Sequence, residues 1–196
     1  MNCKIMYKKR IDVMIDLETT SCRQDAGILS ISMIPFEINM DYDEGREEDR
    51  EKFPIFHKTI NLNSCFFGGH HFDSGTQDWW SKQKPEVKER MMSGIQIQGA
   101  VKELYDSLKN YSEEYELYPW SKGTDFDFPI IEYCFEKYLG EKAPYKYYNK
   151  RDVRTFISEF TDIKSMTFDH GDAHDSLDDC RHQIKQVKEA YKRVCR

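Results

Sequence analysis

Residues 11–18 place the strongest constraint on the fold of this 196-residue chain, because apolar and acidic side chains alternate along them. The segment reads IDVMIDLE, and its two-residue period predicts a β-strand whose faces differ in character. Asp16 and Glu18 leave the strand on one face, whereas Ile15 and Leu17 point to the other face and into apolar packing. Two carboxylates on one face repel each other unless a cation lies between them. Oxygen ligands suit Mg²⁺ or Mn²⁺, so the strand predicts a divalent metal site.

The Asp-x-Glu spacing does not identify a site by itself. The same spacing joins Asp49 and Glu51 within the polar, acidic run of residues 39–52, which we interpret as the solvated tip of a β-hairpin. Asp16 and Glu18 differ because they end a strand that is apolar on its other face. An exposed polar strand end is the alternative interpretation of this pair when it is considered alone.

The remaining pattern predicts a mixed sheet covered by helices. We expect strands at residues 11–18, 27–38, 54–62, 116–121 and 145–148. We expect helices at residues 76–92, 96–111, 128–139 and 153–160, and a further helix at the C-terminus. The first three strands follow one another directly, which favours an antiparallel meander, whereas the later strands alternate with helices as β-α units do. Pro119 indicates that the fourth strand is an outer strand or contains a bulge. The prediction is one α/β domain over residues 1–196, with a five-stranded sheet.

Composition limits the classes of function. The net charge is −6, whereas a protein that coats nucleic acid without specificity is normally basic, so a nucleic acid would be held locally at a pocket. No apolar run approaches the roughly 20 residues that cross a bilayer, and the N-terminal segment does not resemble a signal peptide. Six irregularly spaced cysteines predict reduced thiols and a cytoplasmic location.

A second acidic motif, TDFDFPII, spans residues 124–131. A turn at Gly123 precedes it and a helix is expected from Phe128, so Asp127 lies at or beside the helix N-terminus. Asp127 could simply cap that helix, with Pro129 tolerated in the first turn. Asp125 is a competing acid two residues earlier.

A third motif, HDSLDD, spans residues 174–179 at the start of the C-terminal helix. That helix has one apolar face, formed by Leu177, Cys180, Ile184, Val187, Tyr191 and Val194. Five helical residues turn through about 500°, so His174 and Asp179 would not share a face if both were helical. We therefore expect His174 in the preceding loop and Asp179 in the first turns, with Asp175 or Ser176 as the cap. A surface loop is the alternative setting for His174.

These three segments supply the groups that phosphodiester hydrolysis requires. Two divalent ions about 4 Å apart can clamp the attacking and leaving oxygens of a phosphodiester, and four carboxylates roughly neutralise the charge of those ions. A histidine whose pKa is near neutral can take the proton from the attacking water.

The segments IDLETTS at 15–21, TDFDFPII and HDSLDD resemble the three exonuclease motifs of the DEDD superfamily, which is DnaQ-like and has a ribonuclease H-like fold. The histidine five residues before Asp179 is similar to that of the DEDDh subgroup. The resemblance implies that Asp16, Glu18, Asp127 and Asp179 bind two Mg²⁺ or Mn²⁺ ions, with His174 as general base. It also implies release of nucleoside 5′-monophosphates from a 3′ end. Asp125 and Asp178 duplicate acids of the motifs and are the alternative ligands.

Two further segments, TQDWWSKQ at 76–83 and RDVRTF at 151–156, resemble a smaller subfamily. That subfamily contains a mycobacterial 3′–5′ exoribonuclease and phage exonucleases of the exonuclease A type. Neighbours on a helix point about 100° apart, so one indole of the Trp79–Trp80 pair can pack in the core while the other stacks on a base. The residues that we predict to contact substrate are Thr19, Phe126, Trp79, Trp80, Gln83 and Arg154.

The sequence thus predicts a 3′–5′ exonuclease that acts on single-stranded RNA or DNA, in the cytoplasm of a bacterium or a phage-infected host. The alternatives are a non-catalytic nucleic-acid-binding module with the same fold and a metal-dependent nucleotide phosphohydrolase. A general base speaks against the binding module, which would not need one. No motif encodes a contact to the 2′-OH, so RNA and DNA both stay open, as does a homodimer.

Overall fold

The computed structural model describes residues 8–40, 52–82, 85, 86, 89, 93–167 and 175–195, and the side chains of residues 76, 77, 79 and 80 lie outside this description. Most of the expected hairpin tip at 39–52 therefore also lies outside it. None of the helices within the described ranges is long and apolar enough to span a membrane.

The strands form one five-stranded mixed sheet in the order β3-β2-β1-β4-β5. The strands are β1 (Lys9–Thr19), β2 (Ile28–Phe36), β3 (Phe56–Thr59), β4 (Tyr115–Ser121) and β5 (Arg151–Asp152). The helices are α2 (Leu62–Phe67), α3 (Ser74–Ser81), α5 (Ile97–Glu114), α6 (Asp127–Leu139), α7 (Val153–Phe156), α8 (Thr161–Lys164) and α9 (Ser176–Val194), with a 3₁₀ turn, η1 (Tyr147–Asn149). β1, β2 and β3 pair antiparallel, whereas β4 pairs parallel with both β1 and β5. The predicted mixed sheet is confirmed.

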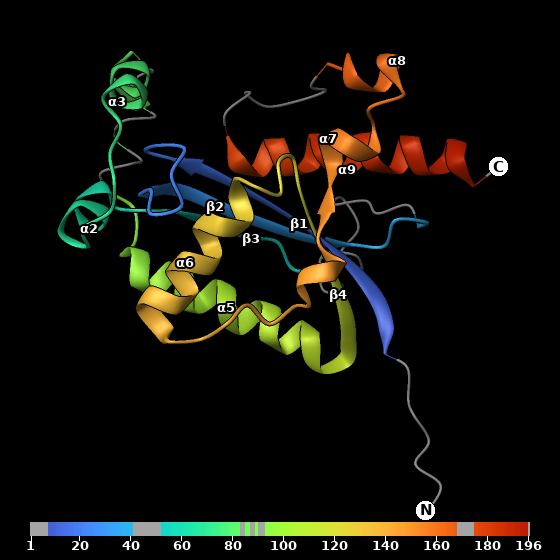
Figure 1. Cartoon of the computed structure of the whole chain (residues 1–196), viewed down its shortest axis with the longest axis horizontal. Helices are drawn as coiled ribbons and strands as arrows, with labels where there is room; N and C mark the ends of the chain where they lie inside the picture. The colour runs from blue at the N-terminus through green and yellow to red at the C-terminus, as the bar shows by residue number, and fades with distance from the viewer. Residues whose placement is uncertain are drawn as a thin grey trace, which may run out of the picture.

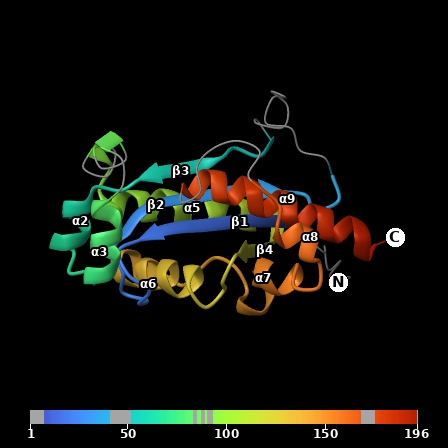
Figure 2. The ribbon, with the colours of Figure 1, turned by 90° about the horizontal axis from the view of Figure 1, so that it is seen from above.

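The two faces of β1 pack into two different cores. Ile15 and Leu17 lie in the core that α5 and α6 cover, as the alternation predicted. Met14, on the opposite face, packs with Cys180 and Val187 of α9. Figure 1 shows α9 on one side of the sheet and α5 and α6 on the other, and Figure 2 shows α9 running along β1 and β2. The acidic face of β1 is therefore the face that α9 covers.

Buried hydroxyl groups fix the start of α9 on the sheet. Asp175 caps the helix by accepting a hydrogen bond from the Leu177 N–H. Of the two residues expected as the cap, Asp175 and Ser176, the cap is therefore Asp175. The Ser176 hydroxyl is fully buried and lies 2.8 Å from the hydroxyl oxygens of both Ser30 and Ser32 on β2. Since Ser30 and Ser32 pair with Glu18 and Asp16 in the β1–β2 register, this network lies beside the acidic pair.

The fourth strand differs from its prediction in position. Pro119 indicated an outer strand or a bulge, but β4 lies between β1 and β5. The proline is tolerated there because β5 pairs only with Trp120 and Ser121, so Pro119 pairs with a strand on the β1 side alone. The outer-strand interpretation was wrong, although the part of β4 that holds the proline has no strand neighbour on its second side.

The chain after α6 also departs from prediction. Residues 145–148 do not form a strand, since η1 begins at Tyr147 and the last strand is Arg151–Asp152. The helix expected at 153–160 is shorter than predicted, because α7 ends at Phe156 and the next helix, α8, begins only at Thr161. The third strand is shorter than predicted because α2 begins at Leu62. At the C-terminus, Val194 is 60% exposed, so the apolar face of α9 is not buried over its whole length.

We predict that Ser176→Ala lowers the free energy of unfolding by about 1–3 kcal/mol, because the Ser30 and Ser32 hydroxyls lose a buried partner. Urea denaturation measures the change. Ser165→Ala is the matched control, since that hydroxyl is exposed at the end of α8, and its effect should stay within about 0.5 kcal/mol. Equal effects of the two substitutions would contradict the role of the network.

Candidate active site

Three carboxylates converge at the C-terminal end of β1. Among the side chains that the structure describes, Asp16, Glu18 and Asp179 offer ligand oxygens that all lie within 4.8 Å of one another. Each is half-buried, so solvent can still reach the group. Asp16 and Glu18 come from the α9-facing side of β1, and Asp179 comes from the first turn of α9. Segments more than 150 residues apart thus meet at one point.

Asp127 approaches this group from the other side of β1. It is the first residue of α6 and is 3% exposed, and Phe126 is the residue in the cap position. Its Oδ1 accepts a hydrogen bond from the Leu17 N–H at 3.2 Å, which ties the start of α6 to the strand between Asp16 and Glu18. Gly123 has a φ of 137°, a value that favours glycine, and accordingly it shapes the turn before α6. Asp127 is not one of the three convergent carboxylates, but its charge acts on them.

The two alternative aspartates lie in different settings. Asp125 is exposed and lines a cavity next to α6. Asp178 forms an ion pair at 2.9 Å with Arg181, which lies about one turn further along α9. Of the two aspartates in the third motif, only Asp179 belongs to the group of three within the described part of the chain. In the second motif, Asp127 differs from the exposed Asp125 because it is buried, bonded to the Leu17 N–H and acts through its charge on Asp16 and Glu18.

Burial and mutual repulsion raise the pKa values of the carboxylates. Burial, followed by the charges of Asp179 and Asp127, raises the pKa of Glu18 to about 8. Burial is also the main reason why the pKa of Asp16 lies well above its ordinary value, with the charges of Asp127 and Asp179 next. The pKa of Asp127 rises to about 7, again chiefly through burial. These closely spaced carboxylate oxygens repel one another when they are ionised. They are the hard ligands that divalent cations prefer, and a bound cation would stabilise their ionised forms.

Gln183 is a polar residue of this site that the sequence did not single out. It lies one turn after Asp179 on α9 and is 2% exposed. Its Nε2 donates a hydrogen bond to Asp16 Oδ1 at 2.7 Å, which lowers the pKa of Asp16 against the larger effect of burial. A glutamine next to the apolar positions Cys180 and Ile184 was the available signal. Such a residue is buried at a cost unless it has a polar partner.

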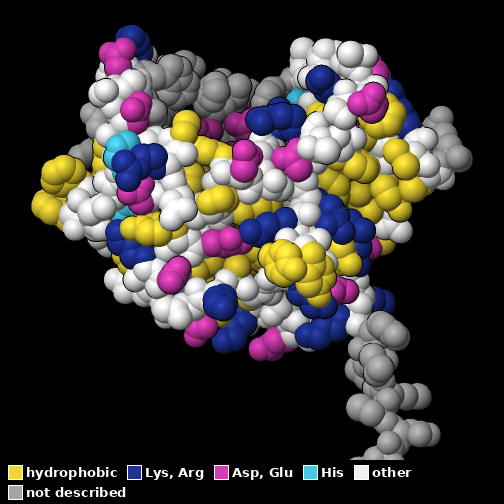
Figure 3. Space-filling model, viewed as in Figure 1, with side chains coloured by type: hydrophobic (Ala, Val, Ile, Leu, Met, Phe, Trp, Pro, Cys, Tyr) yellow, Lys and Arg dark blue, Asp and Glu magenta, His cyan; other side chains and the backbone are white. Residues whose placement is uncertain are grey.

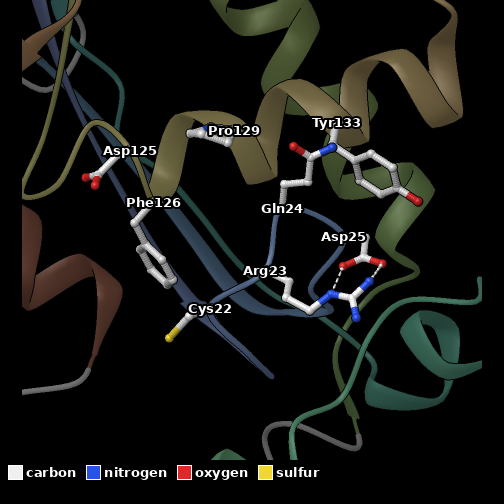
Figure 4. A pocket seen from close by; sticks show the side chains of 8 residues that line it. All are labelled: Cys22, Arg23, Gln24, Asp25, Asp125, Phe126, Pro129 and Tyr133. Carbon is white, nitrogen blue, oxygen red and sulfur yellow. Dashed lines mark hydrogen bonds and ion pairs between the residues drawn. The ribbon is translucent and has the colours of Figure 1, made fainter.

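A cavity of about 620 Å³ lies between the turn after β1 and the start of α6 (Figure 4). It is lined by Cys22, Arg23, Gln24, Asp25, Asp125, Phe126, Pro129 and Tyr133. The ring of Phe126 points toward Cys22, and Arg23 forms a two-bond ion pair with Asp25 on the opposite wall (Figure 4). Because Phe126 directly precedes Asp127, the cavity begins next to the acidic group.

The other predicted contact residues divide into placed and unplaced side chains. Arg154 is exposed, donates to the Lys122 carbonyl at 3.2 Å and lowers the pKa of Asp127 through its charge. The Thr19 hydroxyl is buried and donates to the Ser21 carbonyl at 2.8 Å. Trp79 and Trp80 belong to α3, but their side chains lie outside the description, as do Gln83 and His174 entirely.

A mixed sheet whose central strand carries an acidic pair, joined by an aspartate of the last helix, is the arrangement of the DnaQ-like exonucleases with a ribonuclease H-like fold. The chain belongs to the Rv2179c-like family of 3′–5′ exoribonuclease domains, whose model matches residues 11–191. It is 26% identical to an exodeoxyribonuclease of Enterobacteria phage T4, over 91% of this chain and 88% of that protein. The chain is therefore a hydrolytic nuclease of the exonuclease class, as its motifs predicted.

Solved structures of low sequence identity share the fold. E. coli exonuclease I in complex with an oligonucleotide has a TM-score of 0.64 at 11% identity, over 96% of this chain and 42% of that one. The Mg²⁺- and Mn²⁺-bound form of S. pombe Pop2p has a TM-score of 0.60 at 12% identity, over 94% of this chain and 84% of that one. The chain spans less than half of exonuclease I, so that likeness concerns one part of the larger enzyme. Both likenesses confirm the predicted architecture.

We predict that stability without metal falls as the pH rises from about 5 to about 8. The pKa of Glu18 is raised from 4.5 to about 8, so the folded protein holds more protons than the unfolded chain in this window. Its free energy of unfolding must then decrease with rising pH. Adding Mg²⁺ should raise the melting temperature more at pH 8 than at pH 5, because the ion competes with protons for the same oxygens. Thermal unfolding in chelator and in Mg²⁺ measures both effects.

Glu18→Gln is the matched variant for this measurement. It removes the charge and keeps the shape, so the metal-free variant should be more stable than the parent at pH 8 and should respond less to Mg²⁺. Stability that is flat or rises with pH in chelator would show that the carboxylates are not held in the crowded state described above.

Proposed function

We propose that this exonuclease removes nucleoside 5′-monophosphates from the 3′ end of single-stranded nucleic acid, with two Mg²⁺ or Mn²⁺ ions at the end of β1. The observation that carries the proposal is the convergence of Asp16, Glu18 and Asp179 within 4.8 Å of one another from opposite ends of the chain. Asp127 completes the proposed set of ligands. When bound, the ions supply charge neutralisation of the scissile phosphate and activation of a water at neutral pH.

The protein's own contribution begins with the orientation of the carboxylates. Gln183 holds one oxygen of Asp16, and the Leu17 N–H holds one oxygen of Asp127. Each bond fixes the orientation of its carboxylate, so two of the four proposed ligands are held in place by hydrogen bonds from α9 and from β1 itself. Preorganisation of this kind lowers the reorganisation that binding a charged phosphate would otherwise require.

The substrate would reach these groups along the exposed side of the turn that holds Gly123. Arg154 presents a guanidinium there, beside Asp127, and can contact a phosphate. The cavity beside Phe126 has the volume of a small-molecule pocket, and the ring offers a face for a base near the 3′ end. Because the Thr19 hydroxyl is engaged within the turn, we propose that its contact with substrate is made through the backbone.

His174 is the proposed general base, on the segment just before the Asp175 cap of α9. A histidine can accept a proton from water near neutral pH, which the crowded carboxylates cannot do while they bind cations.

The five cysteines within the described ranges all carry free thiols, which supports the proposed cytoplasmic location.

The main test is shortening of 5′-labelled single-stranded RNA and DNA in Mg²⁺ or Mn²⁺. We expect a ladder of products that shorten from the 3′ end, and Asp179→Asn should reduce the rate by at least about a thousandfold. Asp178→Asn is the matched control on the adjacent residue, and it should retain most activity because Asp178 pairs with Arg181 away from the group. Absence of shortening with either metal, or equal loss in both variants, would contradict the proposal. Phosphate release from mononucleotides alone would instead indicate a phosphohydrolase.

We predict separately that His174→Ala slows turnover by about 10²–10⁴-fold, the usual contribution of a general base. The Mg²⁺-induced rise in melting temperature should persist in this variant, because the histidine is not a proposed ligand. Single-turnover rates and thermal unfolding distinguish the two roles. A variant that loses the Mg²⁺ response together with its activity would identify His174 as a ligand, and an unchanged rate would exclude it as the base.

A further inference from the structure

The segment of residues 146–154 exposes two adjacent aromatic rings that the proposed chemistry does not use. Tyr147 is 79% exposed and Tyr148 is 59% exposed, and their ring centroids lie 5.2 Å apart with the planes nearly perpendicular. Neighbouring exposed rings on a folded surface often mark an interaction site. Figure 3 shows hydrophobic side chains gathered in front of the sheet with Lys and Arg side chains around them.

The exposure of these rings is fixed by the backbone that carries them. The next residue in η1, Asn149, is 3% exposed and donates through Nδ2 to the Leu117 carbonyl of β4 at 3.1 Å. Arg151 Nη1 donates to the Tyr148 carbonyl at 3.1 Å from the other side. The turn is thus anchored to the sheet, and the two tyrosines are displayed rather than left loose at a chain end.

The same segment is basic in a chain whose net charge is −6. Between residues 146 and 154 there are four cations, Lys146, Lys150, Arg151 and Arg154, and one acid, Asp152. Lys146 and Lys150 each contact one glutamate. Within the described part of the chain, Arg151 and Arg154 form no ion pair, and Arg151 lies over the Tyr118 ring at 4.9 Å. The two guanidinium groups thus have no acidic partner there, and Lys146 is 56% exposed although it contacts Glu116, so an anionic partner can reach it as well.

We propose that Lys146, Tyr147, Tyr148 and Arg151, the tyrosine surface, bind the single strand upstream of the 3′ end that is hydrolysed, an inference that rests on the proposed function. The two rings stack on bases, and Lys146 and Arg151 contact phosphates. Stacked aromatic rings bordered by cations are the features with which proteins hold single strands without reading their sequence.

A short stretch of chain connects the tyrosine surface to the active site. Arg154, six residues after Tyr148, lies beside Asp127 and contacts the turn at Lys122. Six residues span at most about 20 Å, which corresponds to about six stacked nucleotides of one strand. A strand of about 20 nucleotides therefore reaches both the active site and the tyrosines, and a strand of about three nucleotides is the short comparison because it extends least beyond the active site.

The test compares these two lengths in the full chain with its activating metal. For Tyr147→Ala/Tyr148→Ala we expect KM for the strand of about 20 nucleotides to rise about tenfold or more, since a stacked base contributes about 1–3 kcal/mol. KM for about three nucleotides and kcat for both lengths should not change. Tyr147→Phe/Tyr148→Phe keeps the rings and should retain the parent KM.

The salt dependence of binding tests the proposed phosphate contact of Lys146. Lys146→Ala should lower the slope of log affinity against log salt by about 0.7 for the long strand, the value for one phosphate contact. Lys102→Ala is the matched control, because that exposed lysine is also ion-paired, on α5, and it should leave the slope unchanged.

Several outcomes would overturn the inference. An unchanged KM for the long strand would do so, and so would an equal rise in KM for both lengths, which indicates damage to the site. A change of oligomeric state without a change in strand affinity would assign the surface to a second copy of the chain instead. If the parent chain shortens neither strand, the proposed function itself fails. If the parent chain is active and the tyrosine variant has the same KM, only the inference about the tyrosine surface fails.

Discussion

The packing of β1 between two apolar cores is the interaction on which the rest of the structure depends, because it holds mutually repelling carboxylates together. Asp16 and Glu18 are adjacent on one face of the central strand, and Asp179 is brought to within ligand distance of both by α9. Burial, followed by the charges of the neighbouring carboxylates, disfavours the ionised forms and raises the pKa values of Glu18 and Asp16, and bound cations would offset this effect. The apolar cores on both sides of β1 hold the acids together because their packing fixes the strand and α9 independently of the charges.

Polar contacts then convert that packing into a defined geometry. The Ser176 hydroxyl joins the start of α9 to β2, one strand away from the acidic pair, and Gln183 joins the next turn of the helix to Asp16. On the other side of the strand, the Leu17 N–H receives Asp127. These bonds are buried or half-buried, where an unpaired polar group is costly, so each of them restricts how far α9 and α6 can shift along β1.

The distribution of charge explains how an acidic chain can act on a polyanion. The negative charge is concentrated at the proposed metal site, and bound divalent ions would supply the attraction for the phosphate there. Away from the site, the attraction is local. In the proposed function it comes from Arg154, whose charge acts on Asp127, and from the tyrosine surface, where rings and a guanidinium group lie on one anchored turn. A general positive charge over the whole surface is not needed when only the 3′ end and a short upstream stretch must be held.

The sequence alone determined the features that depend on neighbours along the chain. The two-residue period of β1 placed Asp16 and Glu18 opposite Ile15 and Leu17, and the apolar stripe of α9 placed Asp179 in its first turn. Local patterns failed where contacts distant in sequence prevailed. Burial of Asn149 against β4 makes η1 a turn rather than the predicted strand, and a glutamine on α9 became a partner of Asp16. Motif context and spacing favoured Asp127 over Asp125 and Asp179 over Asp178, and the tertiary structure adds that Asp127 is buried against β1 and that Asp179 joins the convergent group. Adjacent acids have the same chemistry, and only the packing of α6 and α9 against β1 determines which of them meets the others.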